Sequence, residues 1–77
     1  MTMTATQIEA LLRPAFPDAL IELTDTAGDG DHWSARIVSA AFRGKSRVQQ
    51  HQMVYAAIGA QMGGELHALA LQTAVPD

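Results

Sequence analysis

Three histidines are the side chains of this sequence best suited to chemistry. His32 follows an acidic, glycine-rich stretch, His51 lies within a predicted helix, and His67 lies at the start of a predicted strand. Imidazole is the commonest nitrogen ligand for metals and titrates near neutral pH. The simpler interpretation of each histidine is a surface or hydrogen-bonded structural residue. Without a thiolate they make a poor metal site alone, although they could complete a site whose other ligands come from a partner.

The other residues that could do chemistry are few. The 77 residues contain no cysteine, which excludes disulfides, a self-contained thiolate zinc site and a cysteine nucleophile. No serine lies in a nucleophile-elbow sequence, and residues 43–46 match only the last letters of a phosphate-binding loop. The acids are gathered on a predicted turn that is open to water, which does not suit a paired-carboxylate site. We therefore predict that the protein is not an enzyme.

Charge is unevenly distributed along the chain. Four acids fall between residues 22 and 31, and three of the five basic residues, Arg43, Lys45 and Arg47, fall within five positions. The simpler interpretation of both clusters is solvated surface. Basic side chains at the start of a helix could instead bind the phosphates of a nucleic acid. Because the net charge is −3, we expect any DNA binding to be weak and strongly dependent on salt.

The elements that position these residues begin with a short helix and a hairpin. A capping box at residues 4–7 precedes apolar residues at helical spacing, and two prolines end that helix. Residues 19–24 and 32–39 alternate as strands on either side of the turn 27–31, whose two glycines suit unusual backbone angles. This pattern predicts an antiparallel hairpin.

A longer helix and a third strand are predicted in the second half of the chain. A short helical link over residues 40–45 leads to a second capping box at residues 46–49. The helix that follows should run to residue 61 or 62, where Gly63 and Gly64 stop it. Residues 65–73 then alternate as a strand, with His67 on the same side as Leu69.

The order of the predicted elements is αββααβ. Helices that cover one face of a three-stranded sheet give an α+β fold around one core, to which we expect Leu11, Ile58 and Leu69 to contribute. The length fits a single domain over residues 1–77. No apolar run is long enough to span a bilayer, and the N-terminus lacks a signal-peptide pattern. We therefore expect a cytoplasmic protein that does not contact membranes.

Five segments, taken in order, carry a resemblance to a known family. They are Gly-Asp-Gly-Asp-His-Trp at 28–33, Ile-Val-Ser at 37–39, Phe-Arg-Gly-Lys at 42–45, Val-Gln-Gln-His-Gln-Met-Val at 48–54 and Glu-Leu-His-Ala-Leu-Ala-Leu-Gln-Thr at 65–73. Together they resemble the BolA family of small stress-linked and iron–sulfur-related proteins, over about residues 5–76. The resemblance implies the same αββααβ order, like a class II KH domain that lacks a Gly-x-x-Gly loop.

The resemblance also implies a partner and a cofactor. Members of this family bind monothiol glutaredoxins in heterodimers that share a [2Fe-2S] cluster, and they act in cluster assembly, trafficking or iron-linked regulation. The glutaredoxin cysteine and the thiol of glutathione are the ligands on one side. The histidine of the family's His-Ala-Leu strand, His67 here, is a ligand on the other. No cofactor is expected in the isolated protein, which should be a monomer or a weak homodimer.

The sequence departs from the family pattern in the loop between the first two strands. That loop often supplies a second ligand, either cysteine or histidine, and here Asp29 lies near the position of such a cysteine. His32, at the start of the strand, is our candidate for the fourth ligand, because imidazole can replace thiolate on one iron. The family is also described as transcriptional regulators. The alternative function is therefore KH-like nucleic-acid binding through Arg43, Lys45 and Arg47.

Overall fold

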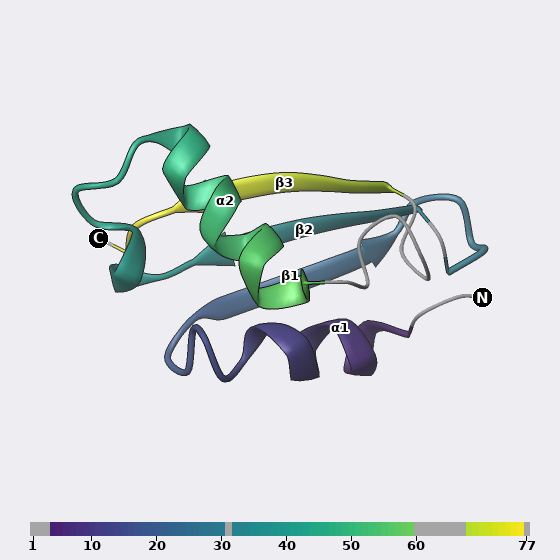
Figure 1. Cartoon of the computed structure of the whole chain (residues 1–77). Helices are drawn as coiled ribbons and strands as arrows, with labels where there is room; N and C mark the ends of the chain where they lie inside the picture. The colour runs from purple at the N-terminus through teal and green to yellow at the C-terminus, as the bar shows by residue number, and fades with distance from the viewer. Residues whose placement is uncertain (1–3, 31, 60–67, 77) are drawn as a thin grey trace.

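The computed structural model describes residues 4–30, 32–59 and 68–76 (Figure 1). Its elements are α1 (Ala5–Leu12), β1 (Leu20–Asp25), β2 (His32–Val38), the short 3-10 helix η1 (Ala40–Phe42), α2 (Arg47–Ile58) and β3 (Ala68–Ala74). The predicted αββααβ order and α+β class are confirmed. The part of the third strand predicted before residue 68, including His67, lies outside the described residues.

Both α-helices begin at the capping boxes that the sequence predicts. The Thr4 hydroxyl accepts a hydrogen bond from the Gln7 backbone N–H at 3.1 Å, while the Gln7 side chain accepts one from the Thr4 N–H at 2.8 Å. Ser46 and Gln49 repeat the arrangement at the start of α2, at 3.2 and 2.8 Å. These bonds satisfy backbone donors that have no partner within the helix, so the two start points follow from local sequence.

The end of α2 differs from the prediction. The helix ends at Ile58, not at residue 61 or 62, and Gly59 caps it with a φ of +66°. Glycine adopts positive φ without the steric penalty that a Cβ atom brings, so it commonly ends helices. The earlier glycine therefore ends this helix before the predicted stop at Gly63 and Gly64, which lies outside the described residues.

The sheet has the order β1-β2-β3, with β2 in the centre. The predicted hairpin is confirmed, because β1 and β2 are antiparallel and Leu20 lies opposite Val38. β3 pairs with β2 in parallel, so that His32 lies opposite Ala68 at the start of both strands. The starts of β2 and β3 therefore share one end of the sheet, at the turn that joins β1 to β2, and α2 begins at the other end, near the C-terminus (Figure 1).

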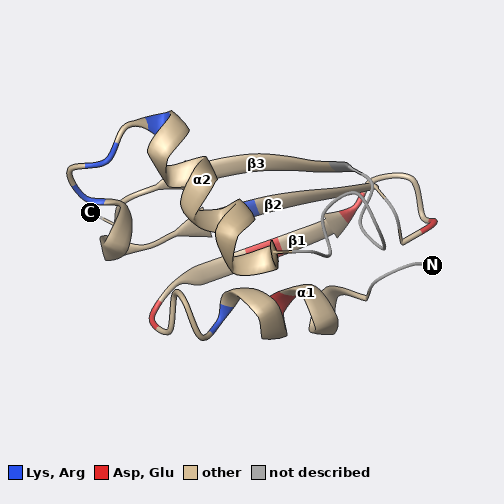
Figure 2. Ribbon diagram, in the orientation of Figure 1, with Lys and Arg blue, Asp and Glu red and all other residues tan. Residues whose placement is uncertain are grey.

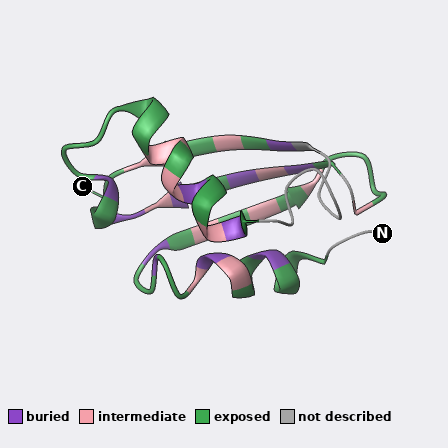
Figure 3. Cartoon of the chain, viewed as in Figure 1, coloured by how far each residue is buried: buried purple, intermediate pink, exposed green. Residues whose placement is uncertain are grey.

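Both α-helices cover the same face of the sheet, as predicted (Figures 1 and 3). The core between them consists of buried apolar side chains: Ile8, Leu12, Phe16, Ala19, Trp33, Ala35, Ile37, Phe42, Val54, Ile58 and Leu69. The expected contributions of Ile58 and Leu69 are confirmed, and Leu11 packs against this core as a partly buried residue. Within the described ranges, no helix is long and apolar enough to cross a membrane.

Candidate functional site

His32 is exposed at the first position of β2, and a carboxylate holds its ring. Its Nδ1 lies 3.0 Å from Oδ2 of Asp29, and its backbone N–H donates to Oδ1 of the same residue at 3.3 Å. Because a carboxylate only accepts, we assign the proton of the neutral ring to Nδ1, which leaves the lone pair on Nε2. Metal-binding histidines commonly have their second nitrogen oriented by a carboxylate in this way.

The acidic turn before His32 is shaped by one side chain. Asp25 accepts hydrogen bonds from the backbone N–H groups of Gly28 and Gly30, at 2.9 and 2.8 Å. The indole N–H of the buried Trp33 donates to the Gly30 carbonyl at 2.9 Å, which ties the turn to the core. The carboxylate of Asp25 is therefore committed to the turn itself and is not a free charge.

Metal ligands do not gather in one place within the part of the chain that the structure describes. No group of three or more His, Cys, Asp or Glu side chains there is placed to hold a metal ion. Glu22 is paired with Arg36 at 3.0 Å across the two strands of the hairpin. His67, the principal predicted ligand, lies outside the described residues. It directly precedes Ala68, which is the register partner of His32.

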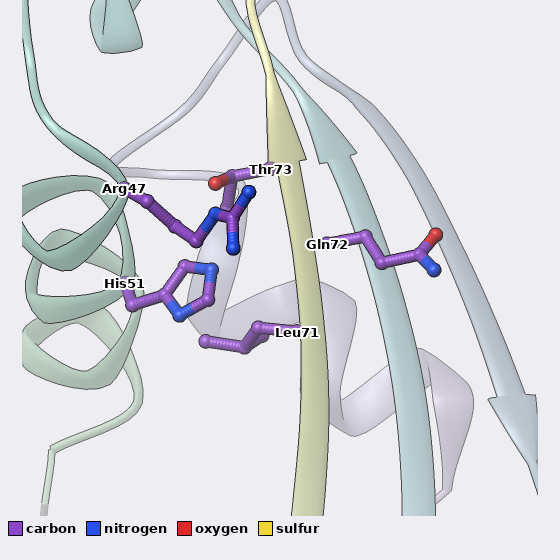
Figure 4. A pocket seen from close by; sticks show the side chains of 5 residues that line it. All are labelled: Arg47, His51, Leu71, Gln72 and Thr73. Atoms are coloured by element: carbon purple, nitrogen blue, oxygen red, sulfur yellow. The ribbon is translucent and has the colours of Figure 1, made fainter.

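The third histidine lies on a different part of the molecule. His51 is partly buried on α2 and lines a cavity of about 350 Å³ between that helix and β3. The other lining residues are Arg47, Leu71, Gln72 and Thr73 (Figure 4). Reasoning from the sequence missed this cavity, because its two walls come from segments far apart in the chain. The helical spacing of Arg47 and His51, four residues apart, was the only local signal for it.

The predicted basic cluster gathers at the end of the molecule where α2 begins (Figure 2). Arg43 donates to the Pro76 carbonyl at 3.3 Å. Lys45 and Arg47 are exposed, and neither forms an ion pair with a described residue. Lys45 lines a shallow hollow with Gln49 and its helix neighbours, whereas Arg47 lines the cavity beside β3. The three residues therefore share one end of the fold but do not form a single flat face.

Comparison with known proteins identifies the family of this fold. A family model described as BolA-like protein matches residues 17–77. The chain belongs to the BolA family. The resemblance seen in the sequence is thereby confirmed, and the site residues can be considered within a BolA domain.

Relatives and solved structures support this membership. BolA-like protein 1 from Homo sapiens is 34% identical over 80 residues, which cover 90% of this chain and 58% of that protein. The DNA-binding transcriptional regulator BolA from Escherichia coli (strain K12) is 32% identical over 78 residues, covering 92% of this chain and 74% of that protein. A solved bolA protein homologue from Coxiella burnetii matches with a TM-score of 0.82 and 28% identity, over 99% of this chain and 95% of that one.

Proposed function

We propose that this BolA-family protein binds a monothiol glutaredoxin and that the two share a [2Fe-2S] cluster in iron–sulfur assembly, trafficking or iron-linked regulation. The chain has no cysteine, so the thiolate ligands would come from the glutaredoxin and from glutathione. This chain would supply imidazole nitrogen from His67, with His32 as the fourth ligand. The role rests on the family resemblance of the His-Ala-Leu strand and on the surroundings of His32.

The observation that carries the proposal is the exposed His32 at one end of the sheet. Its side chain is 52% exposed, so a partner can reach Nε2 without opening the core. Asp29 holds the opposite ring nitrogen, which fixes the direction of the lone pair. The register partner of His32 is Ala68, the neighbour of His67 in sequence. The strand that His67 directly precedes in the sequence therefore begins beside His32.

Anaerobic reconstitution tests this proposal directly. The full chain would be mixed with a monothiol glutaredoxin, glutathione, ferrous iron and sulfide, and the product purified by size exclusion. We expect a heterodimer whose visible absorption and circular dichroism differ from those of the cluster-bound glutaredoxin alone. A glutaredoxin whose active-site cysteine is replaced by serine is the control, and it should give no cluster. Failure of the two proteins to co-purify, with or without cluster, would contradict the proposal.

DNA binding is the second candidate, and a specific observation favours keeping it. The E. coli relative is named a DNA-binding transcriptional regulator, and Lys45 and Arg47 here are exposed cations without carboxylate partners in the described part of the chain. Two or three phosphate contacts supply only weak affinity, which falls steeply with salt. Tight, sequence-selective binding of a DNA duplex by the isolated protein at physiological salt would rank this function above the cluster role.

A further inference from the structure

β3 is an edge strand whose outer side offers unpaired backbone groups. The Ser39 N–H donates to the Ala74 carbonyl at 3.0 Å, so Ala74 directs its polar groups toward β2. Successive residues of a strand direct these groups to opposite sides. Leu71 and Thr73 must therefore direct their N–H and C=O groups away from β2. No backbone hydrogen bond formed among the described residues outside the sheet reaches those groups.

Among the described residues, the cavity beside this edge is lined by a guanidinium and an imidazole and by no acid. Figure 4 shows the side chains of Arg47 and His51 reaching from α2 toward Leu71 and Thr73 of β3. The walls are held together, because the Thr73 hydroxyl donates to the Gln50 side chain of α2 at 2.5 Å. The cavity of about 350 Å³ thus has a fixed position relative to the free backbone groups of the strand.

We propose that an extended peptide segment of a partner protein pairs with the outer edge of β3 as a fourth strand and places a carboxylate side chain between Arg47 and His51. Strand addition satisfies the free backbone groups with a repeating set of partners, while alternate side chains of the peptide enter the groove. The guanidinium of Arg47 fits a carboxylate in a two-pronged geometry. This site does not depend on the cluster, because it lies toward the end of β3 away from Ala68.

Charge distinguishes this edge from the opposite edge of the sheet. The outer strand β1 contains two acids and no basic residue, and its Glu22 already holds Arg36 in an ion pair, so the strand offers an acidic segment no unpaired cation. The cavity at β3 combines an exposed guanidinium with an imidazole, and the described residues that line it include no carboxylate. A peptide that carries glutamate should therefore select β3 over β1, although both strands are edges.

A nuclear magnetic resonance titration of the isotope-labelled full chain tests this inference. The probe is an acetylated and amidated heptapeptide of alternating valine and threonine with one central glutamate. We expect shifts of the amide signals of Leu71 and Thr73 and of the Arg47 side chain, with the β1 signals unchanged. Two control peptides separate the contributions. One replaces glutamate by glutamine. The other is methylated at every inner backbone nitrogen, so it cannot donate backbone hydrogen bonds to β3.

Matched variants test the contributions of Arg47 and His51 to peptide binding. Arg47→Ala should weaken binding of the glutamate peptide about fivefold, which is what a partly exposed charge pair can supply. The same substitution should not affect the glutamine peptide. Lys45→Ala removes a neighbouring cation that lies outside this cavity, and it should leave both affinities unchanged. His51→Ala should also weaken binding of the glutamate peptide.

Several outcomes would overturn the inference. One is the absence of β3 shifts at millimolar glutamate peptide, and another is equal binding of the glutamine or methylated peptide. Concentration-dependent β3 shifts in the peptide-free protein would show that a second copy occupies the edge. If a DNA oligonucleotide shifts the same amide signals to saturation while the peptide does not shift them, the cavity is a nucleic-acid site.

Discussion

The two ends of the sheet carry charge clusters that look alike in the sequence but differ in the fold. At the acidic end, Asp25 is bonded to backbone amides and Asp29 holds the ring of His32. At the basic end, Lys45 and Arg47 are exposed and form no ion pair with a described residue. The acids build the loop that presents a histidine, whereas these cations are left for ligands. A cluster's composition therefore does not reveal whether its charges are structural or available.

The two ends are also positioned by different forces. The acidic turn depends on hydrogen bonds that its own carboxylates accept from backbone N–H groups, which are strong but partly open to water. The basic end follows η1, whose Phe42 is fully buried and packs with its ring centroid 5.2 Å from that of Phe16. Substitutions of Phe42 should therefore disturb the basic end most, and carboxylate substitutions should disturb the acidic end.

The largest expected effect comes from the aromatic anchor of the basic end. Phe42→Ala should lower the free energy of unfolding by about 3–5 kcal/mol, because it leaves a cavity in a small core. If that variant does not fold, Phe42→Leu should still cost about 1 kcal/mol. Urea unfolding followed by far-ultraviolet circular dichroism measures both. Tyr55→Ala, which truncates a half-exposed ring, is the control, and an equal loss there would refute the assignment.

A smaller loss of stability is expected when the acid that shapes the turn is replaced. Asp25→Ala removes the acceptor of two backbone hydrogen bonds and should cost about 2 kcal/mol. Asp18→Ala removes an exposed acid that forms no hydrogen bond or ion pair with a described residue, and it should stay within about 0.5 kcal/mol of the parent. Urea midpoints compare the two variants. Identical midpoints would mean that the turn holds its shape without Asp25.

Substitutions of the two candidate ligands, His67 and His32, should change the cluster and not the fold. His67→Ala should alter the visible circular dichroism of the reconstituted glutaredoxin complex and make the cluster more labile, while the proteins still associate. His32→Ala should do the same more mildly, and His51→Ala should leave the spectrum unchanged. Acidification should also release the cluster, because a protonated imidazole has no lone pair for iron. An unchanged spectrum and full loading in His67→Ala would remove this residue as a ligand.

The smallest effect on the fold is expected at the basic cluster. Neutralising Arg43, Lys45 and Arg47 together should abolish any DNA binding, and the parent affinity should fall with salt at a log–log slope of about −3 or shallower. Fluorescence anisotropy of a labelled duplex over a salt series measures this. Arg36→Gln, at a cation already paired on the sheet, is the matched control and should bind as the parent does. Equal weakening by that control would show a general charge effect.

Local features of the fold were predictable because neighbouring residues determine them. The capping boxes at Thr4 and Ser46 need only residues three positions apart, and the alternation around the turn defined the hairpin. The end of α2 was mispredicted because Gly59 was read as a helix residue, although a single glycine suffices to end a helix.

Features that join distant segments were not predictable in the same way. The parallel pairing that places His32 opposite Ala68 depends on how the third strand docks, and no local pattern specifies that register. The cavity shared by Arg47 and Thr73 has the same origin. For the candidate cluster site, the sequence shows the residue types but not their contacts. It identifies Asp29 only as the residue near the position of the family's loop cysteine. Its contact with the His32 ring appeared only with the fold.

The parallel pairing of β2 with β3 has a consequence for the order in which the chain folds. All of η1 and α2 separates the two strands in the sequence, whereas β1 and β2 are joined by a short turn. Closing the longer connection costs more chain entropy, so the hairpin should form early and β3 should dock late. The edge of β2 that pairs with β3 would then stay exposed until β3 docks. Until then, that edge of β2 stays open to pairing with other chains.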